Sequence, residues 1–379
     1  MKRHIITPRQ NWQQKVEELG FAYHTLDGAT YWDESVFYEF SYSQINTIEQ
    51  TTNELYRLCL KAVDHVIKQN LFDAFFIPEE FIPLIKKSWR YDFPSIYGRY
   101  DISWNGDLNT PPKMLEFNAD TPTSLFEASV IQWFWLKEFN EQYDQFNSIH
   151  EKIISSWKKI KPCLKNKPLY FSCLQQFPED FINVSYLQDC ATQAGIKTNF
   201  VSVPNIGWNG QNFTDDDENK ISNIFKLYPW EWMVSEEFGQ YIQKTNTTWI
   251  EPSWKMILSN KAILPVLWKL FPGHPNLLET YFDDPQGMSS YVEKPLFSRE
   301  GANITIIEDG LITSETKGEY GDEGFVYQQL QKLPNFNGNF PVLGSWIIGG
   351  QAAGMGIRET TSLITDNFSH FVPHAVINP

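Results

Sequence analysis

Apolar residues near the start of the chain recur at the spacing of a helix. Between residues 44 and 70, apolar side chains return every three or four positions, beginning with Ile45 and Ile48, and this period predicts a long amphipathic helix. Pro78 and Pro83 frame a second, shorter helical pattern after it. The aromatic-rich segment 21–42 has no clear period, so no element is predicted there.

Strict alternation then replaces the helical period. Residues 99–104 alternate between polar and apolar side chains, and residues 114–118 form a second extended run, with a turn signal at 105–107 between them. This alternation is typical of the two strands of a hairpin. Side chains two positions apart lie on the same face of a strand. One face of the hairpin region 98–124 therefore carries a polar cluster: Arg99, Asp101, Glu116 and Asn118.

The rest of the chain mixes helices and strands. The polar residues 120–124 are expected to cap a helix that runs from Leu125 to about Phe139. A strand, a helix and a strand are predicted in turn at 168–173, 184–194 and 198–203, and this order is typical of an α/β lobe. Further elements are predicted as a helix at 148–161, strands at 291–292, 304–306 and 325–330, and a hairpin at 342–350.

Length and composition narrow the class of protein. The chain has 379 residues, of which 42% are apolar and 16% aromatic, and its net charge is −15. This length suffices for two or three domains or for one large α/β unit, and the acidic balance argues against nucleic-acid binding. No apolar run approaches the ~20 residues of a membrane span. The N-terminus lacks the apolar core of a signal peptide, and the four cysteines are scattered. We therefore expect a soluble, cytoplasmic protein without membrane partners.

The segment 291–304 carries candidate chemistry. Its short strand delivers Lys294, Pro295 ends the regular pairing, and the polar turn that follows contains Arg299 and Gly301. Glycine permits the positive φ angle that a sharp reversal near a ligand needs. A lysine on a strand beside an arginine-bearing loop suits a lid over a polyphosphate. A surface hairpin with solvated charges is the alternative.

Oxygen donors on the hairpin suggest a metal site. Asp101, Glu116 and Asn118 offer the oxygen ligands that a hard cation such as Mg²⁺ prefers. The alternative is an ordinary polar strand face on which Arg99 neutralises the two carboxylates. The sequence lacks the motifs of phosphate loops, dinucleotide-binding folds, zinc proteases and serine hydrolases.

Two more basic residues stand in settings that suit an anion. Lys261 lies at the start of a short apolar helix, and Arg358 follows Gly354 and Gly356. Paired glycines would let the backbone approach a ligand while the guanidinium binds an anion. Two lysines on separate elements, a glycine-bearing lid, a carboxylate–amide cluster and two arginines are together what a nucleoside triphosphate with Mg²⁺ requires.

Several segments carry a family resemblance. They are RYD at 99–101, LEFNADTPTS at 115–124, SNKAILPVLWKLFPGHPNLL at 259–278, KPLFSREGANI at 294–304, YQQL at 327–330 and GIRE at 356–359. In this order they resemble the glutathionylspermidine synthase family, in which a pre-ATP-grasp region accompanies an ATP-grasp synthetase. The resemblance spans nearly the whole chain and is closest to stand-alone acid–amine ligase-like members.

The resemblance implies an α/β (α+β) protein with an ATP-grasp fold. Residues 1–250 would form the pre-ATP-grasp and substrate region, and residues 251–379 the nucleotide-binding lobes with a lid near 294–304. The metal-ligand strands precede the nucleotide lysines, which is the reverse of most ATP-grasp chains. A permuted arrangement is therefore implied.

A role for each candidate residue also follows from the resemblance. Lys261 and Lys294 would bind the phosphates of ATP, with Arg299 and Gly301 in the lid. Gln328 and Leu330 would lie beside the adenine, and the Mg²⁺ ligands would be Asp101, Glu116 and Asn118. Arg99 and Arg358 would be catalytic groups that steady the carboxylate and the transferred phosphoryl group. Thr121 and Thr123 would contact the substrate.

The implied activity is that of an ATP- and Mg²⁺-dependent ligase that joins a small peptide-like carboxylate to an amine through an acyl phosphate. Polyamines are among the candidate amines. Thr121 and Thr123 stand where the classical synthase has serines, and the region 228–231 also departs from the glutathione-binding pattern. The resemblance therefore does not fix glutathione and spermidine as the substrates. No amidase domain precedes the synthetase region, so hydrolase activity is not expected. The alternatives are a nucleotide-binding protein without catalysis and a kinase, and the oligomeric state is not specified.

Overall fold

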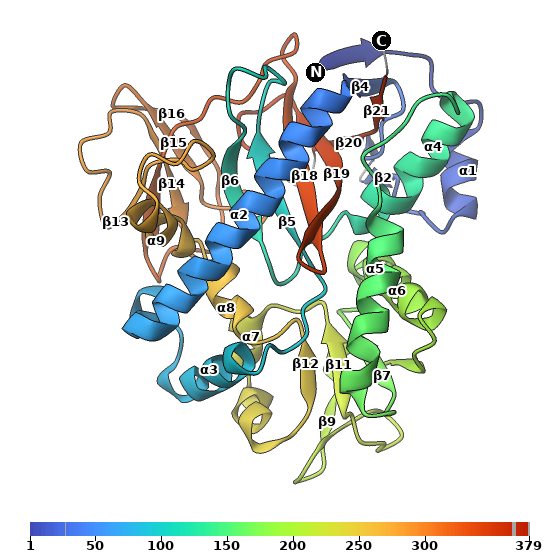
Figure 1. Cartoon of the computed structure of the whole chain (residues 1–379), viewed down its shortest axis with the longest axis vertical. Coiled ribbons are helices and arrows are strands. Elements are labelled where there is room, and N and C mark those ends of the chain that lie inside the picture. The colour runs from blue at the N-terminus through green and yellow to red at the C-terminus, as the bar shows by residue number, and fades with distance from the viewer. Residues whose placement is uncertain (27, 366–368, 378–379) are drawn as a thin grey trace.

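A five-stranded antiparallel sheet forms the middle of this mixed α/β protein (Figure 1). The computed structural model describes residues 1–26, 28–365 and 369–377. The strands follow the order β20-β19-β18-β5-β6, so the sheet joins two distant parts of the chain. Their bounds are β5 Tyr97–Ser103, β6 Lys113–Asn118, β18 Phe340–Ile348, β19 Gln351–Thr360 and β20 His370–Val372.

The predicted hairpin is confirmed as strands β5 and β6. They pair antiparallel, with Asp101 opposite Glu116 and Arg99 opposite Asn118. On its other side, strand β5 pairs with β18, and Asp101 lies opposite Gly344 in that pairing. The polar cluster therefore lies on one face of a sheet that extends well beyond the hairpin.

Helix α2 (Tyr42–Gln69) crosses one face of the central sheet (Figure 1). It begins with a capping box, in which the side chains of Ser41 and Gln44 each accept a hydrogen bond from the other residue's backbone N–H. Its apolar side packs in one core with Tyr100 and Ile102 of β5. The helix predicted over 44–70 and the apolar face of β5 are both confirmed.

Other helices cover the opposite face of the central sheet. A π-helical turn at Glu127–Ile131 leads into α4 (Gln132–Phe139), and α5 (Ile149–Ile160) packs beside it. Trp346 and Ile348 of β18 belong to the core on this side. Helices are thus found where the patterns at 125–139 and 148–161 predict them.

The expected cap of the helix after residue 124 is wrong in one respect. The carboxylate of Asp120 accepts a hydrogen bond from Lys226, and the backbone N–H of Leu125 donates instead to the side chain of Asn183. A buried carboxylate needs a cation to offset its lost hydration, and a backbone N–H alone offsets less of that cost.

The predicted strand–helix–strand lobe is confirmed. Strands β7 (Leu169–Ser172) and β8 (Thr198–Phe200) pair in parallel and are joined by α6 (Pro178–Gln193), which begins at Pro178 rather than at Val184. The sheet order is β12-β11-β7-β8, with all its pairings parallel. The other two strands are β11 (Asn223–Lys226) and β12 (Thr248–Ile250).

A second five-stranded antiparallel sheet holds the lysine-bearing strand predicted at 291–292. Its order is β13-β17-β14-β15-β16, and helix α9 (Ile263–Leu270) packs against β13 and β17. Strands are also confirmed where they were predicted near 304–306 and 325–330. The bounds are β13 Thr280–Phe282, β14 Tyr291–Pro295, β15 Thr305–Glu308, β16 Leu311–Glu315 and β17 Phe325–Gln329.

The two ends of the described chain meet in a small sheet, in which β1 and β21 both pair with β4. The segment 21–42, for which no element was predicted, contains short strands. The remaining strands are β1 Lys2–Ile5, β2 Thr25–Leu26, β3 Ala29–Thr30, β4 Val36–Phe40, β9 Gly207–Trp208, β10 Phe213–Thr214 and β21 His374–Val376. The remaining α-helices are α1 Trp12–Glu18, α3 Ile82–Arg90, α7 Trp230–Ser235 and α8 Lys255–Leu258, and 3₁₀ turns lie at Phe72–Phe75, Glu79–Phe81, Lys161–Leu164, Val203–Asn205 and Glu237–Lys244.

The division of the chain at residue 250 stays a prediction. The central sheet takes β5 and β6 from the first range and β18 to β20 from the second. Among the described residues, no helix is long and apolar enough to cross a lipid bilayer.

Candidate active site

A cavity of about 720 Å³ opens over the polar face of the central sheet and reaches the second five-stranded sheet. The structure brings together around it every site residue that the sequence pointed to, although these residues come from distant parts of the chain. They are Arg99, Asp101, Glu116, Asn118, Thr121, Thr123, Lys261, Lys294, Arg299, Gly301, Gln328, Leu330 and Arg358.

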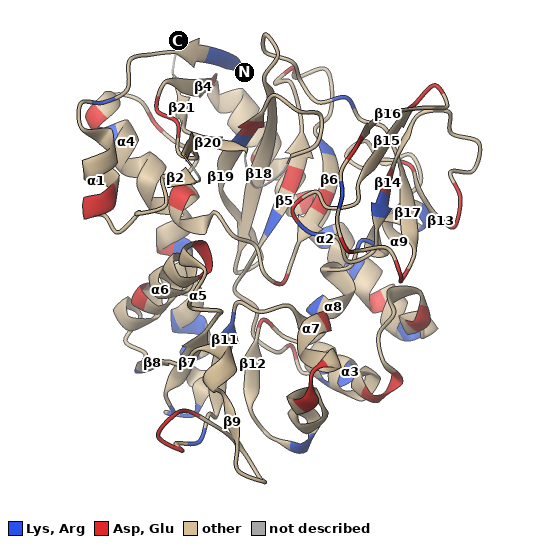
Figure 2. Ribbon diagram, turned by 180° about the vertical axis from the view of Figure 1, so that it is seen from behind, with Lys and Arg blue, Asp and Glu red and all other residues tan. Residues whose placement is uncertain are grey.

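Both candidate lysines reach toward strand β6. Lys261 Nζ lies 3.3 Å from Glu116 Oε2 and donates to the backbone oxygen of Ser298 at 2.5 Å. Lys294 Nζ donates to Gln328 Oε1 at 2.6 Å and to the backbone oxygen of Leu115 at 3.1 Å. Acidic segments of β5 and β6 and a basic segment of β14 accordingly lie close to one another in Figure 2.

Mutual electrostatics set the charges of this group. Burial lowers the pKa of Lys294 to about 8, against an opposing attraction from Glu116, and Lys261 adds repulsion. Burial would raise the pKa of Glu116, but the positive charges of Lys261 and Lys294 outweigh it and hold that pKa well below its usual range. The site therefore presents an ionised carboxylate and a lysine whose charge responds to its surroundings.

Two arginines hold Asp101, one from its own strand β5 and one from β19. Arg99 Nε donates to Asp101 Oδ1 at 2.9 Å, and Arg358 Nη2 lies 2.5 Å from Asp101 Oδ2. Arg358 on β19 reaches across β18, where Gly344 stands between Asp101 and Gly356 in the sheet register. A Cβ atom at Gly344 would lie 3.1 Å from Arg99 Cδ, so the missing side chain leaves room for the side chain of Arg99.

The other glycines near Arg358 do not serve the role that the sequence suggested. A Cβ atom at Gly356 would lie 2.3 Å from the ring of Phe371, and one at Gly354 would lie 2.8 Å from the backbone oxygen of Phe146. The expectation that these glycines let the backbone approach a ligand is therefore wrong, because groups of the protein fill the space beside them.

The proposed metal ligands form one cluster. Asn118 Nδ2 lies 3.4 Å from Asp101 Oδ2 and 3.2 Å from Glu116 Oε1. Among the described residues, no group of three or more His, Cys, Asp or Glu side chains is placed to hold a metal ion, and this set has two carboxylates and one amide. Oxygen donors of this kind fit Mg²⁺, which takes few protein ligands. Their role as metal ligands stays a prediction.

The loop predicted to be a lid lines one side of the cavity. Gly301 has φ +71°, as its sequence context predicted, and a Cβ atom there would lie 2.5 Å from the backbone oxygen of Thr365. Arg299 donates to Thr121 Oγ1 at 2.8 Å and also pairs with Glu231 of α7. Within the described chain, Ser298 Oγ and Arg299 Nε are buried without hydrogen-bond partners. Polar atoms left in this state beside a cavity are candidates to bind a ligand.

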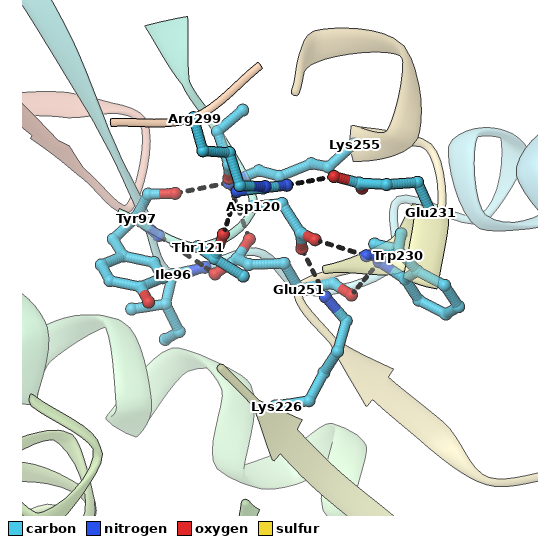
Figure 3. Close-up of polar contacts among 11 residues, drawn as sticks. Ile96, Tyr97, Asp120, Thr121, Lys226, Trp230, Glu231, Glu251, Lys255 and Arg299 are labelled. Atoms are coloured by element: carbon cyan, nitrogen blue, oxygen red, sulfur yellow. Dashed lines mark hydrogen bonds and ion pairs between the residues drawn. The ribbon is translucent and has the colours of Figure 1, made fainter. Parts of the chain in front are cut away.

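Buried ion pairs lie beside the contacts that Arg299 makes with Thr121 and Glu231 (Figure 3). Lys226 Nζ lies 2.5 Å from Asp120 Oδ1, and the backbone N–H of Trp230 donates to Asp120 Oδ2 at 3.0 Å. Asp120 precedes Thr121, and Trp230 precedes Glu231, so this carboxylate connects the two segments that hold Arg299. A second buried pair, Lys255 with Glu251 at 2.7 Å, lies in the same region.

Sequence reasoning missed two acidic residues of the cavity. Glu179 and Asp180, in the first turn of α6, line it together with Tyr31, Tyr228 and Trp232. Burial and the negative charge of Glu179 raise the pKa of Asp180 to about 7. A signal was present, since a proline followed by two acids is typical of the first turn of a helix.

Comparisons with known proteins place the chain in a family. The family model described as glutathionylspermidine synthase preATP-grasp matches residues 3–377. A Haemophilus influenzae protein, named provisionally as an acid–amine ligase, is 42% identical, and the alignment covers 99% of each chain.

Larger relatives match over part of their length. The bifunctional glutathionylspermidine synthetase/amidase of Escherichia coli is 26% identical over 97% of this chain and 63% of its own. The trypanothione synthetase of Crithidia fasciculata is 27% identical over 78% of this chain and 50% of its own. This chain thus spans between half and two thirds of these two relatives.

A solved structure shares the fold. The glutathione synthetase-like effector GSS30 of Globodera pallida superposes with a TM-score of 0.56 over 89% of both chains, at 12% identity. That similarity concerns the fold alone. On the extent of the family match and of the Haemophilus alignment, the chain belongs to the glutathionylspermidine synthase preATP-grasp family.

Proposed function

We propose that the protein is an ATP-dependent ligase that joins a carboxylate to an amine. One observation carries the proposal: Lys261 and Lys294 share a cavity with the carboxylates of Asp101 and Glu116. The basic groups suit the negatively charged triphosphate, and the acidic oxygen donors suit the cation that accompanies it. The relatives named as ligases and synthetases support an enzyme of this class.

The fold would be a permuted ATP-grasp, with the nucleotide between the two five-stranded sheets. Lys261 and Lys294 would bind its phosphates, and Gln328 and Leu330 would border the adenine. The ranges 1–250 and 251–379 would supply the substrate region and the nucleotide-binding lobes, with the central sheet shared between them. The buried, unpartnered Arg299 Nε and Ser298 Oγ support a lid that contacts the phosphates.

Asp101, Glu116 and Asn118 would hold Mg²⁺, which neutralises phosphate charge when it is bound. In the ligand-free arrangement, basic side chains balance the two carboxylates. A triphosphate would draw Lys261 away from Glu116, because the triphosphate carries more negative charge than one carboxylate. The carboxylate would then be available to a cation.

The first chemical step would activate the acid. An oxygen of the substrate carboxylate attacks the γ-phosphorus of ATP, an O–P bond forms, and ADP leaves. Arg99 and Arg358 would steady the carboxylate and the phosphoryl group, and Thr121 and Thr123 would contact the rest of the acid. This step needs mainly positioning and charge neutralisation. A closed lid would exclude the water that hydrolyses an acyl phosphate.

The second step would form the amide. The amine attacks the acyl carbon, a C–N bond forms, and phosphate leaves. Glu179 and Asp180 also line the cavity, and their charge would suit a cationic amine. The names of the relatives, glutathionylspermidine and trypanothione synthetase, support a peptide-like acid and a polyamine.

Trapping with hydroxylamine tests the proposal. The protein is incubated with ATP, Mg²⁺ and a panel of peptides and amino acids paired with polyamines, and ADP release is measured. An acyl phosphate gives a hydroxamate when hydroxylamine replaces the amine. ADP release without hydroxamate would indicate a kinase. The absence of ADP release, with nucleotide still bound, would indicate a binding protein without catalysis.

A further inference from the structure

A fully buried carboxyl group lies behind a residue that lines the cavity. Glu127, the first residue of the π-helical turn, is 0% exposed. Its Oε1 accepts hydrogen bonds from Tyr31 at 2.8 Å and from Tyr23 at 3.0 Å. Its Oε2 is buried and has no hydrogen-bond partner within the described chain. A carboxyl oxygen left in this state is costly for stability and calls for a role.

Tyr31 connects this carboxyl group to the cavity. Its side chain lines the cavity, and its hydroxyl lies 3.3 Å from Ser124 Oγ, another lining group. Tyr23 contacts the same carboxylate oxygen but is not among the described residues that line the cavity. A hydroxyl that donates to Glu127 can at the same time accept from a donor in the cavity.

We propose that Tyr31 and Glu127 form a proton relay that deprotonates the amine before it attacks the acyl phosphate. This inference rests on the proposed function, because it assigns a step of the same reaction. Ammonium groups have no free electron pair, so one proton must leave before a C–N bond can form. Glu179 and Asp180 suit the charged amine, but bare carboxylates there would also favour its protonated form.

The proton moves in two linked transfers. An N–H of the ammonium donates its proton to the Tyr31 oxygen as the Tyr31 hydroxyl passes its own proton to a Glu127 oxygen. The freed electron pair forms the C–N bond, and the C–O bond to phosphate breaks. The second N–H proton passes to the leaving phosphate, which departs as hydrogen phosphate. Neutral Glu127 returns its proton through Tyr31 to solvent after the product leaves. Charge and atoms balance without another reactant.

The surroundings of Glu127 suit a base that works near neutral pH. Burial, followed by the negative charge of Glu179, raises the pKa of Glu127 to about 7, while the hydrogen bonds from Tyr31 and Tyr23 oppose the rise. Arg99 and Arg358 act on Glu179 and partly offset its charge. A base whose pKa lies near the working pH is partly ionised at that pH and is still basic enough to accept a proton.

A purely structural role makes a different prediction. If Glu127 only accepts hydrogen bonds from two tyrosines, glutamine should replace it well, because an amide oxygen accepts in the same way. The variants Glu127→Gln and Tyr31→Phe therefore separate the two roles. Tyr23→Phe is the matched control, since it removes a hydrogen bond to the same oxygen outside the cavity.

The experiment uses the acid and the polyamine that together give most ADP release in the wild type. It compares the rate with that polyamine and the rate with hydroxylamine in its place. A polyamine is protonated at neutral pH, whereas hydroxylamine is mostly uncharged and needs no base. Glu127→Gln and Tyr31→Phe should lower amide formation at pH 7 by about 10²-fold, and the hydroxamate rate should fall far less. The hydroxamate rate also reports correct folding. Tyr23→Phe should retain most of the polyamine rate.

The pH profile completes the test. The wild-type polyamine rate should rise through pH 7 as Glu127 ionises, and the Glu127→Gln rate should instead rise toward the amine's own pKa, about 10. Equal polyamine and hydroxylamine losses, or an unchanged profile in Glu127→Gln, would overturn the relay and leave the ligase standing. If the wild type releases no ADP with any pair, the proposed function fails and the relay fails with it.

Discussion

Lys261, two residues before α9, places its Nζ 3.3 Å from Glu116 Oε2 on strand β6. The two residues come from distant segments, and the sequence suggested one for nucleotide phosphates and the other for a metal ion. Their contact places both candidate roles in one cavity. It also balances the charge of Glu116 while no nucleotide is bound.

Replacement of Glu116 tests its proposed role. We expect Glu116→Ala to lower ligase turnover by about 10²–10³-fold, the usual loss for one well-placed charge stabiliser. Nucleotide affinity should also lose its dependence on Mg²⁺ concentration, measured by calorimetric titration. Glu315→Ala, at an exposed carboxylate on β16, is the control. Normal turnover in Glu116→Ala would remove the metal assignment.

Arg358 should matter more for chemistry than for nucleotide binding, because it contacts Asp101 rather than the candidate phosphate lysines. We expect Arg358→Ala to lower kcat by about 10²-fold or more, with a small change in ATP affinity. Steady-state kinetics and equilibrium nucleotide binding measure the two effects. A large loss of ATP affinity with intact kcat would place Arg358 elsewhere in the mechanism.

The ion pair between Arg299 and Glu231 should hold the lid loop in place. Hydrogen bonds to charged groups contribute about 1.5–3 kcal/mol, so Glu231→Gln should raise the population of open loop roughly tenfold or more. Limited proteolysis within residues 298–303 measures this opening, and added ATP should reduce it. Glu237→Gln, at an exposed carboxylate outside the cavity lining, is the control. Equal cleavage of the Glu231 variant and the wild type would contradict the role of the pair.

The buried pair of Lys226 and Asp120 should be important for stability. Lys226→Met would leave the Asp120 carboxylate buried without its cation, and breaking such a pair costs about 3–5 kcal/mol. Urea unfolding monitored by tryptophan fluorescence measures the loss. The double variant Lys226→Met with Asp120→Leu should recover much of the stability, since the unpaired charge is then gone. A single variant as stable as the wild type would show that Asp120 is satisfied without Lys226.

Glu127 should make stability depend on pH. Its pKa is raised from the ordinary 4.5 to about 7 in the folded protein, so between these pH values the folded state binds more protons than the unfolded state. The free energy of unfolding should therefore fall as pH rises from about 4.5 through 7. The Glu127→Gln variant lacks this contribution, and its stability relative to the wild type should increase over that range. A constant difference between the two proteins would contradict the raised pKa.

Local patterns along the chain were enough to predict several elements. The helix at 44–70 and the hairpin at 98–118 follow from apolar periods that a single segment contains. The positive φ of Gly301 follows from its place in a polar turn. Because helix and hairpin geometry depends on neighbours in sequence, the one-dimensional pattern records it. Residue patterns also singled out most of the candidate site residues, and the resemblance to a known family added Gln328, Leu330, Thr121 and Thr123. All of these candidates line the cavity.

Contacts between distant segments could not be obtained in this way. The pairing of β5 with β18 brings Arg358 to Asp101 across Gly344, and folding places Glu127 behind the cavity. Asp120 resembled a helix cap in the sequence, yet in the fold it pairs with Lys226. Burial and charge neutralisation depend on which residues pack around a side chain in three dimensions. Those neighbours come from distant parts of the chain, so the sequence of one strand or turn does not identify them.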